Sequence, residues 1–310
     1  MTSVAAEPAW SLPPGTVPRR LDVLAMGSFL AEQVIHVERH PGSGGQGSIP
    51  IRSMAASTGG GAANVAVHAA RGGGRTGLLA VTGDGPRSRA ALARMADAGV
   101  DTRGVAVRAG HDADLLVLLA DPAGDWTAME QLDPALRFGT GDLGPAVPFA
   151  EATWFHVDGY AHHTAGTQAV VDEAVARARA AGCLVSVDAA VPSALADPAY
   201  LRSLIARADI AFANRTEAAA LTGVADDDDA VAGALLALGL AVIVLKLGAE
   251  GSLVATASAR ERVPAVPVQV VDTLAAGDAY VGATLVGLAR GSTLMEAARL
   301  GAAAGSRACA

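Results

Sequence analysis

One carboxylate, Asp278, lies where a strand-like run of β-branched residues gives way to an apolar helix, directly after Ala275, Ala276 and Gly277. The helix is expected over residues 275–290, which carry apolar residues at helical spacing and contain no proline. The first N–H groups of a helix lack partners within it and carry partial positive charge, so these three small residues can present bare amides to an anion. A carboxylate in such a turn suits phosphoryl transfer if it accepts the proton of the attacking hydroxyl. An acid that only favours the helix start explains Asp278 equally well.

A glycine-rich stretch, Thr-Gly-Gly-Gly-Ala-Ala-Asn at residues 58–64, leads into another predicted helix. Consecutive glycines such as Gly60 and Gly61 let backbone amides approach a ligand closely. Asn64, in the first helical turn, can donate and accept hydrogen bonds to a hydroxylated substrate. A flexible loop with asparagine as a helix cap is the structural alternative.

Asn214 and Glu217 follow a predicted strand and stand three residues apart. An amide and a carboxylate at this spacing can hold the water shell of a Mg²⁺ ion that bridges nucleotide phosphates, because Mg²⁺ prefers oxygen ligands and keeps several waters. A capping box, with Asn214 as the N-cap and Glu217 as its partner, accounts for the same pair in purely structural terms.

The single lysine of the chain, Lys246, also stands at a predicted strand end, in the sequence Lys-Leu-Gly-Ala-Glu-Gly. Its charge could meet a nucleotide phosphate, while Gly248 and Gly251 allow a tight turn beside a phosphate or a base. A generic hairpin turn is the alternative.

These motifs must be positioned by an alternation of strands and helices. Strands are expected at residues 21–26, 77–81, 153–157, 183–187, 210–213 and 241–245, and helices at 62–71, 87–98, 167–181, 199–208, 216–222 and 228–238. Such alternation predicts an α/β fold whose mainly parallel central sheet has helices on both faces and binds ligands at the carboxyl ends of its strands. The motifs fall at those ends.

Two segments, at about residues 30–56 and 102–130, break the alternation with short β-like runs such as 33–37, 105–107 and 115–119. We expect them to form a small β-sheet lid inserted into a domain that spans residues 19–310. Lids exclude water, which otherwise competes with the acceptor in phosphoryl transfer. Ordinary hairpins at a sheet edge are the alternative. Residues 1–18, rich in alanine and proline, are expected to form a loose tail.

Composition narrows the function class. The chain has 310 residues, a formal net charge of −8 and only 4% aromatic residues. Without a basic cluster, nucleic acid and anionic membranes are poor partners, and a small molecule is the better expectation. Cys183 and Cys309 lack metal-ligand spacing, which suggests reduced thiols in a cytoplasmic protein. The apolar runs are of strand length and too short to span a bilayer.

In their order and spacing, the four motifs resemble the ribokinase-like (PfkB) family of carbohydrate kinases from about residue 21 to the chain end. The most specific parts are residues 272–278, and the glycine-rich stretch leading through Gly-Asp-Gly at 83–85 to Ala-Gly-Val-Asp at 98–101. The resemblance implies a ribokinase-like three-layer sandwich with a β-sheet lid. It also implies ATP-dependent phosphorylation of an alcohol group on a small sugar-like substrate.

The resemblance further implies roles for individual residues. Asp278 would be the base, and the amides of Ala275, Ala276 and Gly277 the anion hole. The other implied sites are substrate contacts at Gly60, Gly61 and Asn64; nucleotide contacts at Asn214, Lys246, Gly248, Gly251 and Thr273; Mg²⁺ held through water by Asn214 and Glu217; and a monovalent cation such as K⁺ at the backbone of Asp272 and Leu274. The family often dimerises through the lid.

Departures from the family pattern concern the substrate side. After the first strand, the family usually has a substrate-binding Asp in a pattern like Gly-Ser-x-Asn-Ala-Asp. In this chain Leu30 stands at the position of the Asn, and Glu32 stands at the position of the Asp. Glu32 keeps the charge and could contact substrate, but Leu30 removes a polar contact expected of a ribose site. Family members also usually continue beyond the position of Ala310 with residues that help to enclose adenine and complete the monovalent-cation loop. A nucleoside kinase of the same fold and a non-catalytic sugar-binding protein remain alternatives.

Overall fold

The computed structural model describes residues 8–13, 16, 18–40, 48–122, 126–162 and 165–310. Its centre is a nine-stranded sheet with the order β13-β12-β11-β10-β9-β8-β1-β4-β5. These strands are β1 Leu21–Met26, β4 Thr76–Gly83, β5 Asp101–Arg108, β8 Ala152–Asp158, β9 Leu184–Asp188, β10 Ile210–Asn214, β11 Val242–Lys246, β12 Ser252–Thr256 and β13 Arg260–Val263. All pairs from β5 to β11 are parallel, and β12 and β13 add an antiparallel edge.

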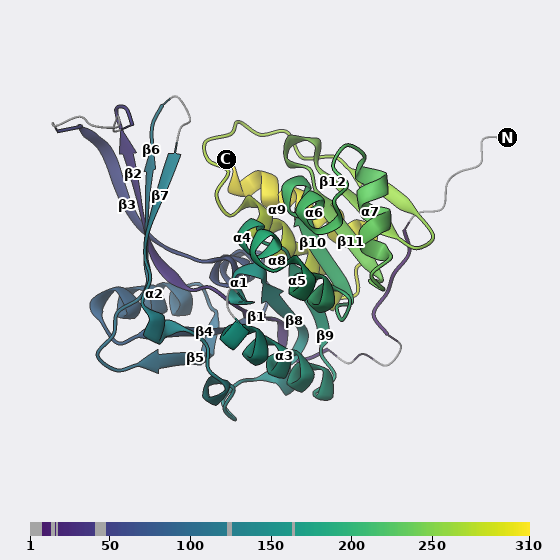
Figure 1. The fold of residues 1–310 in the computed structure, drawn as a ribbon, viewed down its shortest axis with the longest axis horizontal. Coiled ribbons are helices and arrows are strands. Elements are labelled where there is room, and N and C mark those ends of the chain that lie inside the picture. The colour runs from purple at the N-terminus through teal and green to yellow at the C-terminus, as the bar shows by residue number, and fades with distance from the viewer. Residues whose placement is uncertain (1–7, 14–15, 17, 41–47, 123–125, 163–164) are drawn as a thin grey trace.

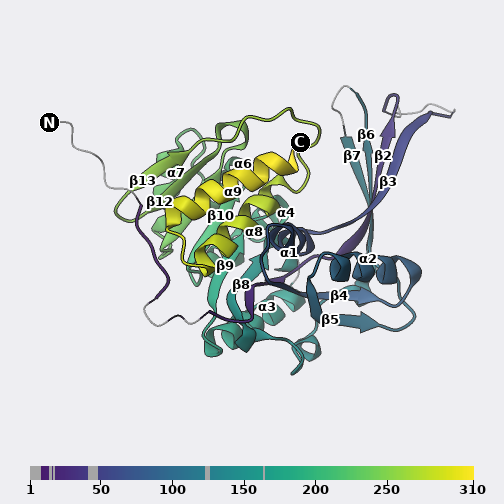
Figure 2. The same cartoon turned by 180° about the vertical axis from the view of Figure 1, so that it is seen from behind.

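Helices cover both faces of this sheet (Figures 1 and 2). One face carries α1 Gly61–Arg71, α2 Pro86–Asp97, α8 Ala276–Ala289 and α9 Leu294–Ala308, and the other carries α3 Ala165–Ala180, α4 Val191–Ala196, α5 Pro198–Ile205, α6 Arg215–Thr222 and α7 Asp228–Leu236. Strand residues alternate between the two cores. In β1, for example, Leu24 and Met26 belong to one core cluster and Val23 and Ala25 to the other. A parallel sheet buried on both faces requires continuous apolar runs, which is why β1 and β4 are buried throughout.

Four neighbouring strands each end on a polar residue. Asp158 ends β8, Asp188 ends β9, Asn214 ends β10 and Lys246 ends β11. The register pairs Asp158 with Asp188, and Asn214 with Lys246. Because the strands are parallel, these polar side chains gather along one edge of the sheet, where such folds bind ligands.

A second, four-stranded sheet, which we call the small sheet, stands apart from the central sheet, above α2, β4 and β5 in the view of Figure 1. Its order is β3-β2-β6-β7, with β2 Leu30–Val37, β3 Ile51–Gly59, β6 Leu115–Ala120 and β7 Trp126–Gln131. The expected strand at 105–107 does not belong to it. That stretch lies in β5, which pairs in parallel with β4 in the central sheet, so the second small-sheet segment begins near residue 115 rather than 102. The short β-branched run at 105–107 suits an edge strand of either sheet. Only the strand with which it pairs determines the sheet to which it belongs.

The N-terminal segment also differs from expectation in its described part. Pro8 is buried, and the ring of Trp10 packs on Trp154 with a centroid distance of 5.6 Å. This part of residues 1–18 therefore covers the core rather than forming a loose tail, because an aromatic ring gains free energy by leaving water. The predicted α/β class, with a mainly parallel sheet, helices on both faces and a separate small sheet, is confirmed.

Candidate active site

Asp278 lies in the first turn of α8 and is held by a neighbour from a distant part of the chain. Its Oδ2 accepts a hydrogen bond of 2.9 Å from Nδ2 of Asn64 on α1. The two helices pack against each other, and Gly282 of α8 is close enough to α1 that an added Cβ would lie 2.8 Å from the carbonyl oxygen of Val65. The glycine-rich motif and the α8 motif thus form one site.

The surroundings of Asp278 favour its neutral form more than water does. Burial raises the pKa of the carboxyl to about 6, against the hydrogen bond from Asn64 and the charge of Lys246, while Asp158 and Glu217 add to the rise. A base whose pKa lies near neutrality can accept a proton readily and still be ionised at neutral pH. This raised pKa suits a general base, and that role of Asp278 stays a prediction.

The turn before Asp278 departs slightly from the predicted helix start. Ala275 is the N-cap, outside the helix, and its φ of 56° makes it the one non-glycine residue with positive φ in the described chain. L-residues adopt this left-handed conformation at a cost of about 1–2 kcal/mol. Backbone strain of this kind is found at ligand-binding turns. At the start of α8 the Ala276 N–H donates a long hydrogen bond of 3.4 Å to the carbonyl oxygen of Thr273, and a contact of the Ala275, Ala276 and Gly277 amides with phosphate stays a prediction.

Gly60 and Gly61 have a packing role. Gly60 has a φ of 100°, and a Cβ there would lie 2.4 Å from the carbonyl oxygen of Ser28. At Gly61 a Cβ would lie 2.6 Å from Oδ1 of Asp158. The Ser28 hydroxyl donates to Asp158 at 2.6 Å and accepts from the Gly61 amide at 2.8 Å. Glycine is therefore required to bring α1 against the strand ends, whereas a contact of Gly60 or Gly61 with substrate stays a prediction.

Lys246 is paired inside the protein. Its Nζ lies 2.7 Å from both carboxylate oxygens of Asp188, and both side chains are largely buried. Burial opposes the charge on Lys246, but the carboxylates of Asp188 and Glu217 outweigh it and raise the pKa of the ammonium group. The ammonium also lies under the α8 turn, since a Cβ on Gly277 would be 3.3 Å from Nζ. The paired ammonium group of Lys246 therefore lies next to the predicted anion hole.

Asn214 and Glu217 form the capping box that was the structural alternative. Oδ1 of Asn214 accepts from the Glu217 amide at 2.9 Å, and Oε2 of Glu217 accepts from the Asn214 amide at 2.7 Å. Glu217 is buried, and burial raises its pKa. Both side chains are thus already engaged, and a role toward Mg²⁺ through water stays a prediction.

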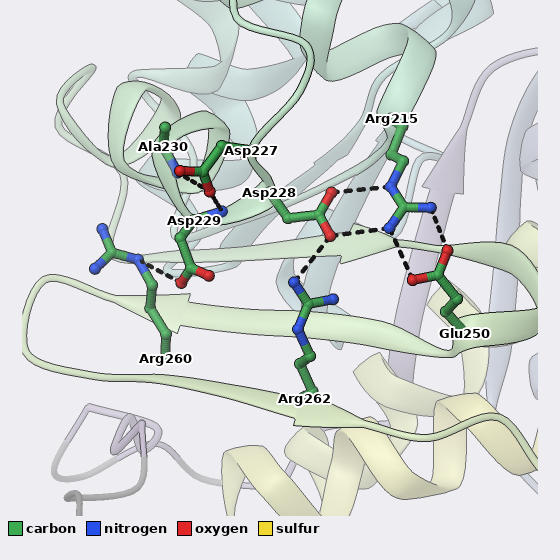
Figure 3. A network of polar contacts seen from close by, with 8 residues as sticks. All are labelled: Arg215, Asp227, Asp228, Asp229, Ala230, Glu250, Arg260 and Arg262. Atoms are coloured by element: carbon green, nitrogen blue, oxygen red, sulfur yellow. Dashed lines mark hydrogen bonds and ion pairs between the residues drawn. The ribbon is translucent and has the colours of Figure 1, made fainter.

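Arg215, between them, connects three elements around this corner (Figure 3). Its guanidinium pairs with Asp228 at the start of α7 and with Glu250 in the short 3₁₀ helix η5 (Gly248–Glu250). Asp228 also pairs with Arg262 of β13, while Asp227 caps α7. Within the acidic run at residues 226–229, Asp227 therefore serves helix capping, and Asp228 and Asp229 serve ion pairing.

A cavity of about 570 Å³, which we call the C-terminal cavity, opens beside this corner. It contains many of the residues predicted to bind nucleotide, together with an apolar wall. The predicted residues among its lining are Asn214, Lys246, Gly248, Gly251, Thr273, Ala276 and Gly277. The apolar wall comes from residues 265–268 and from α9. The tertiary structure thus brings the predicted nucleotide residues to one cavity.

A second cavity, of about 450 Å³, lies between the small sheet and the central domain, and we call it the small-sheet cavity. Leu30 lines it, as do Gly27 and Ser28. Glu32 shares the cavity-facing side of the small sheet with Glu130, because the register aligns Glu32 with Leu116 and Leu116 with Glu130. Its carboxylate accepts from the Ser57 hydroxyl at 2.8 Å and is not among the lining residues. A contact of Glu32 with substrate stays a prediction.

Asp272 and Leu274 are exposed, and Oδ1 of Asp272 accepts from the Leu274 amide at 2.9 Å. No group of three or more His, Cys, Asp or Glu side chains within the described ranges could hold a metal ion by itself. A Mg²⁺ ion would therefore need oxygen atoms from the nucleotide and water in addition to Asn214 and Glu217, which fits its preference for water and phosphate ligands.

Three site residues were missed in the sequence. Ser28, Asp158 and Asp188 organise the glycine turn and the lysine pair. Asp158 and Asp188 are the last residues of β8 and β9, while the predicted strands stop one residue earlier. The rule that drew attention to Asn214 and Lys246, a polar residue directly after a buried strand, would have found both aspartates.

Two further observations concern the whole chain. Cys183 is buried, Cys309 is half-buried, and both are free thiols, as expected. Among the described residues, none of the helices has the length and apolar character needed to cross a membrane.

Comparisons with known proteins assign this chain to a family. The sequence model of the pfkB family carbohydrate kinase matches residues 20–310. A fructokinase from Klebsiella pneumoniae is 33% identical over 238 residues, covering 74% of this chain and 76% of the relative. An aminoimidazole riboside kinase from Salmonella typhimurium is 31% identical over 258 residues, covering 81% and 80%.

Among solved structures, a putative ribokinase II from E. coli in complex with ATP and Mg²⁺ has the same fold, with a TM-score of 0.80 and 21% identity over 93% of this chain and 92% of that one. The predicted family is thereby confirmed. The chain belongs to the pfkB family of carbohydrate kinases and is a phosphotransferase with an alcohol group as acceptor.

Proposed function

We propose that this protein transfers the γ-phosphoryl group of ATP to a hydroxyl group of a small sugar or sugar-derived substrate, with Asp278 as the catalytic base. The observation that carries the proposal is the buried carboxylate of Asp278, which accepts a hydrogen bond from Asn64 and directly follows a residue of the C-terminal cavity. The preceding residue, Gly277, lines the C-terminal cavity. In addition, Asp158 is near enough to raise the pKa of Asp278 and holds Ser28, which lines the small-sheet cavity.

In this proposal the acceptor binds in the small-sheet cavity and ATP binds in the C-terminal cavity. Support for ATP comes from the cavity itself, where an apolar wall suits a base and the start of α8 suits phosphate. It also comes from the E. coli structure of the same fold that holds ATP and Mg²⁺. Bound Mg²⁺, held through water by Asn214 and Glu217, would neutralise phosphate charge.

The residues of the chain then have distinct tasks. Asn64 orients the Asp278 carboxylate, which accepts the proton as the hydroxyl oxygen attacks phosphorus. The amides of Ala276 and Gly277 and the nearby ammonium group of Lys246 stabilise the negative charge on the transferred group. The small sheet excludes water from the acceptor. A monovalent cation at the backbone of Asp272 and Leu274 and a cytoplasmic location belong to the proposal as implied by the family.

Replacing Asp278 with asparagine tests the assignment. Asp278→Asn keeps the size and the hydrogen bond partner but removes the base, so turnover should fall by about 10²–10⁴-fold. ADP release over a panel of sugars, sugar acids and nucleosides measures turnover, and titration calorimetry with ATP should give an unchanged affinity. Asp226→Asn, the same substitution at an exposed position on the acidic run, is the matched control. Near-normal turnover by Asp278→Asn would refute the role of Asp278 as base.

A further inference from the structure

The small-sheet cavity is unusual for a sugar site because its walls are mostly apolar. Three leucines and three aromatic residues are among the residues that line it. The apolar and aromatic lining residues are Phe29, Leu30, Val81, Leu132, Leu136, Phe138, Tyr160 and Ala161. A free hexose carries hydroxyl groups around its whole ring, and each one facing such a wall would lose its hydrogen bonds to water without replacement.

The charged residues that line the same cavity disfavour the binding of an anion. Its charged lining residues in the described chain are Asp114, Glu130 and Arg137. Arg137 Nη1 lies 3.0 Å from Oδ2 of Asp114, so the one cation is already paired. Oδ1 of Asp114 accepts from the Asp133 amide at 2.6 Å, which fixes the carboxylate in place. The lining therefore carries a net charge of one negative unit, and a phosphate or carboxylate entering it would meet two acids and no unpaired base.

We propose that the acceptor is an uncharged molecule in which a hydroxylated ring is joined to a planar, weakly polar group, as in a nucleoside, and that the Asp114–Arg137 pair rejects sugar phosphates and sugar acids. This inference rests on the proposed kinase function. The hydroxylated ring lies toward Ser28 and Asp278, and the planar group lies between Leu30 and Leu132 of the small-sheet side and Phe138 of the central domain. Apolar walls with a few placed polar groups are typical of sites for such ligands.

A substrate comparison with the wild-type chain is the first test. The acceptors are adenosine and cytidine, D-ribose and D-fructose, and fructose 6-phosphate and gluconate, each at saturating ATP and Mg²⁺. We expect kcat/KM for the better nucleoside to exceed that of every other acceptor by about 10-fold or more, the scale set by unpaired hydroxyl groups. A larger kcat/KM for a free sugar or a sugar phosphate, lost in Asp278→Asn, would overturn the inference and leave the proposed function intact.

Two variants of cavity-lining residues distinguish the effect of the Asp114–Arg137 pair on substrate selection from the effect of the net charge of the cavity. Asp114→Asn keeps the acceptor atom for the Asp133 amide but frees Arg137, so kcat/KM for fructose 6-phosphate should rise relative to that for adenosine by about 10-fold. Glu130→Gln removes the same charge from the same wall without touching Arg137 and should give a clearly smaller rise. Equal ratios in Asp114→Asn and the wild-type chain would overturn the role of the pair.

A binding measurement keeps the inference testable if turnover is absent. Titration calorimetry of Asp278→Asn with adenosine, cytidine and D-fructose, in the presence of a non-hydrolysable ATP analogue, should detect binding of a nucleoside and weaker binding of the sugar. Leu30→Asn should weaken nucleoside binding by about 10-fold. Tighter binding of D-fructose, or no nucleoside binding, overturns the inference. Nucleoside binding without Asp278-dependent ADP release supports the inference and refutes the proposed kinase function.

Discussion

At the scale of single residues, Asp278 and Lys246 are opposite charges that both lie near the first turn of α8. Asp278 is oriented by Asn64 from α1, and Lys246 is held by Asp188 from β9. Neither partner is a neighbour in sequence. The reactivity of the two groups therefore depends on contacts that the motifs around them do not contain.

The pH dependence of turnover should report on the Asp278 carboxyl. Because its pKa is raised to about 6, kcat/KM should fall as the pH drops through about 6, where the base becomes protonated. The Asn64 hydrogen bond lowers that pKa, so Asn64→Ala should move the acid limb to higher pH. Rate profiles of both proteins with one acceptor would measure this. An acid limb that stays in place, or moves to lower pH, would argue against Asp278 as the titrating base.

Breaking the buried pair should cost stability. In Asp188→Asn the ammonium group of Lys246 stays buried without its charged partner, and loss of one member of such a pair costs about 3–5 kcal/mol. Replacing both, in Asp188→Asn with Lys246→Met, should restore part of this loss. Urea unfolding measures both effects. If the double variant were as unstable as Asp188→Asn, desolvation of the lysine charge would not be the cause.

At the scale of elements, the site depends on how helices and loops are held at the strand ends. Gly251 illustrates the constraint, since its φ is 94° and a Cβ there would lie 2.0 Å from the carbonyl oxygen of Val263. The turn η5 is thereby locked against β13. Arg215 then connects η5 to the starts of α6 and α7 (Figure 3).

Removing Arg215 should loosen the C-terminal cavity more than it destabilises the protein. The pairs are partly exposed, and exposed ion pairs contribute little to stability, so Arg215→Ala should lower the free energy of unfolding only slightly. The KM for ATP should rise because η5, which lines the cavity, loses its tie to α6, while kcat changes little. Arg262→Ala is the matched control, since it also removes a partner of Asp228 but leaves η5 untouched. An equal rise in KM in both variants would contradict this role for Arg215.

At the scale of the whole molecule, the two faces of the small sheet differ. One face, with Glu130, borders the cavity. The other carries Met54 and Met129, which are 61% and 47% exposed, alongside Ile35 and Val117 by register. Exposed apolar side chains gathered on one sheet face are typical of protein interfaces.

We therefore propose that two copies of the chain pair through this outer face, as the family resemblance implies. Light scattering coupled to size-exclusion chromatography should give a dimer for the wild-type chain. Met54→Lys combined with Met129→Lys should give a folded monomer, because burying two charges opposes association. Leu300→Lys, at a 50% exposed position of α9, is the control and should remain a dimer. A monomeric wild-type chain would end the proposal.

Local patterns were enough to predict much of this protein. The alternation of apolar strands and helices predicts the layered α/β fold, and the sequence of four motifs predicts the kinase family. Asp278 and Lys246 could be selected because a polar residue directly after a buried strand or at a helix start is a local feature. These features can be predicted from the sequence because they depend on the periodicity and the hydrogen bonding of the local backbone.

Only the tertiary structure determines which strands pair and which side chains contact each other. It assigns β5 to the central sheet, Asp188 to Lys246 and Asn64 to Asp278, and it pairs Arg137 with Asp114 in the small-sheet cavity. Each contact joins segments far apart in the chain, so no local spacing encodes it. The sequence fixes which side chains can carry a charge, but their protonation and their availability to a ligand depend on the burial and the neighbouring charges that the fold provides.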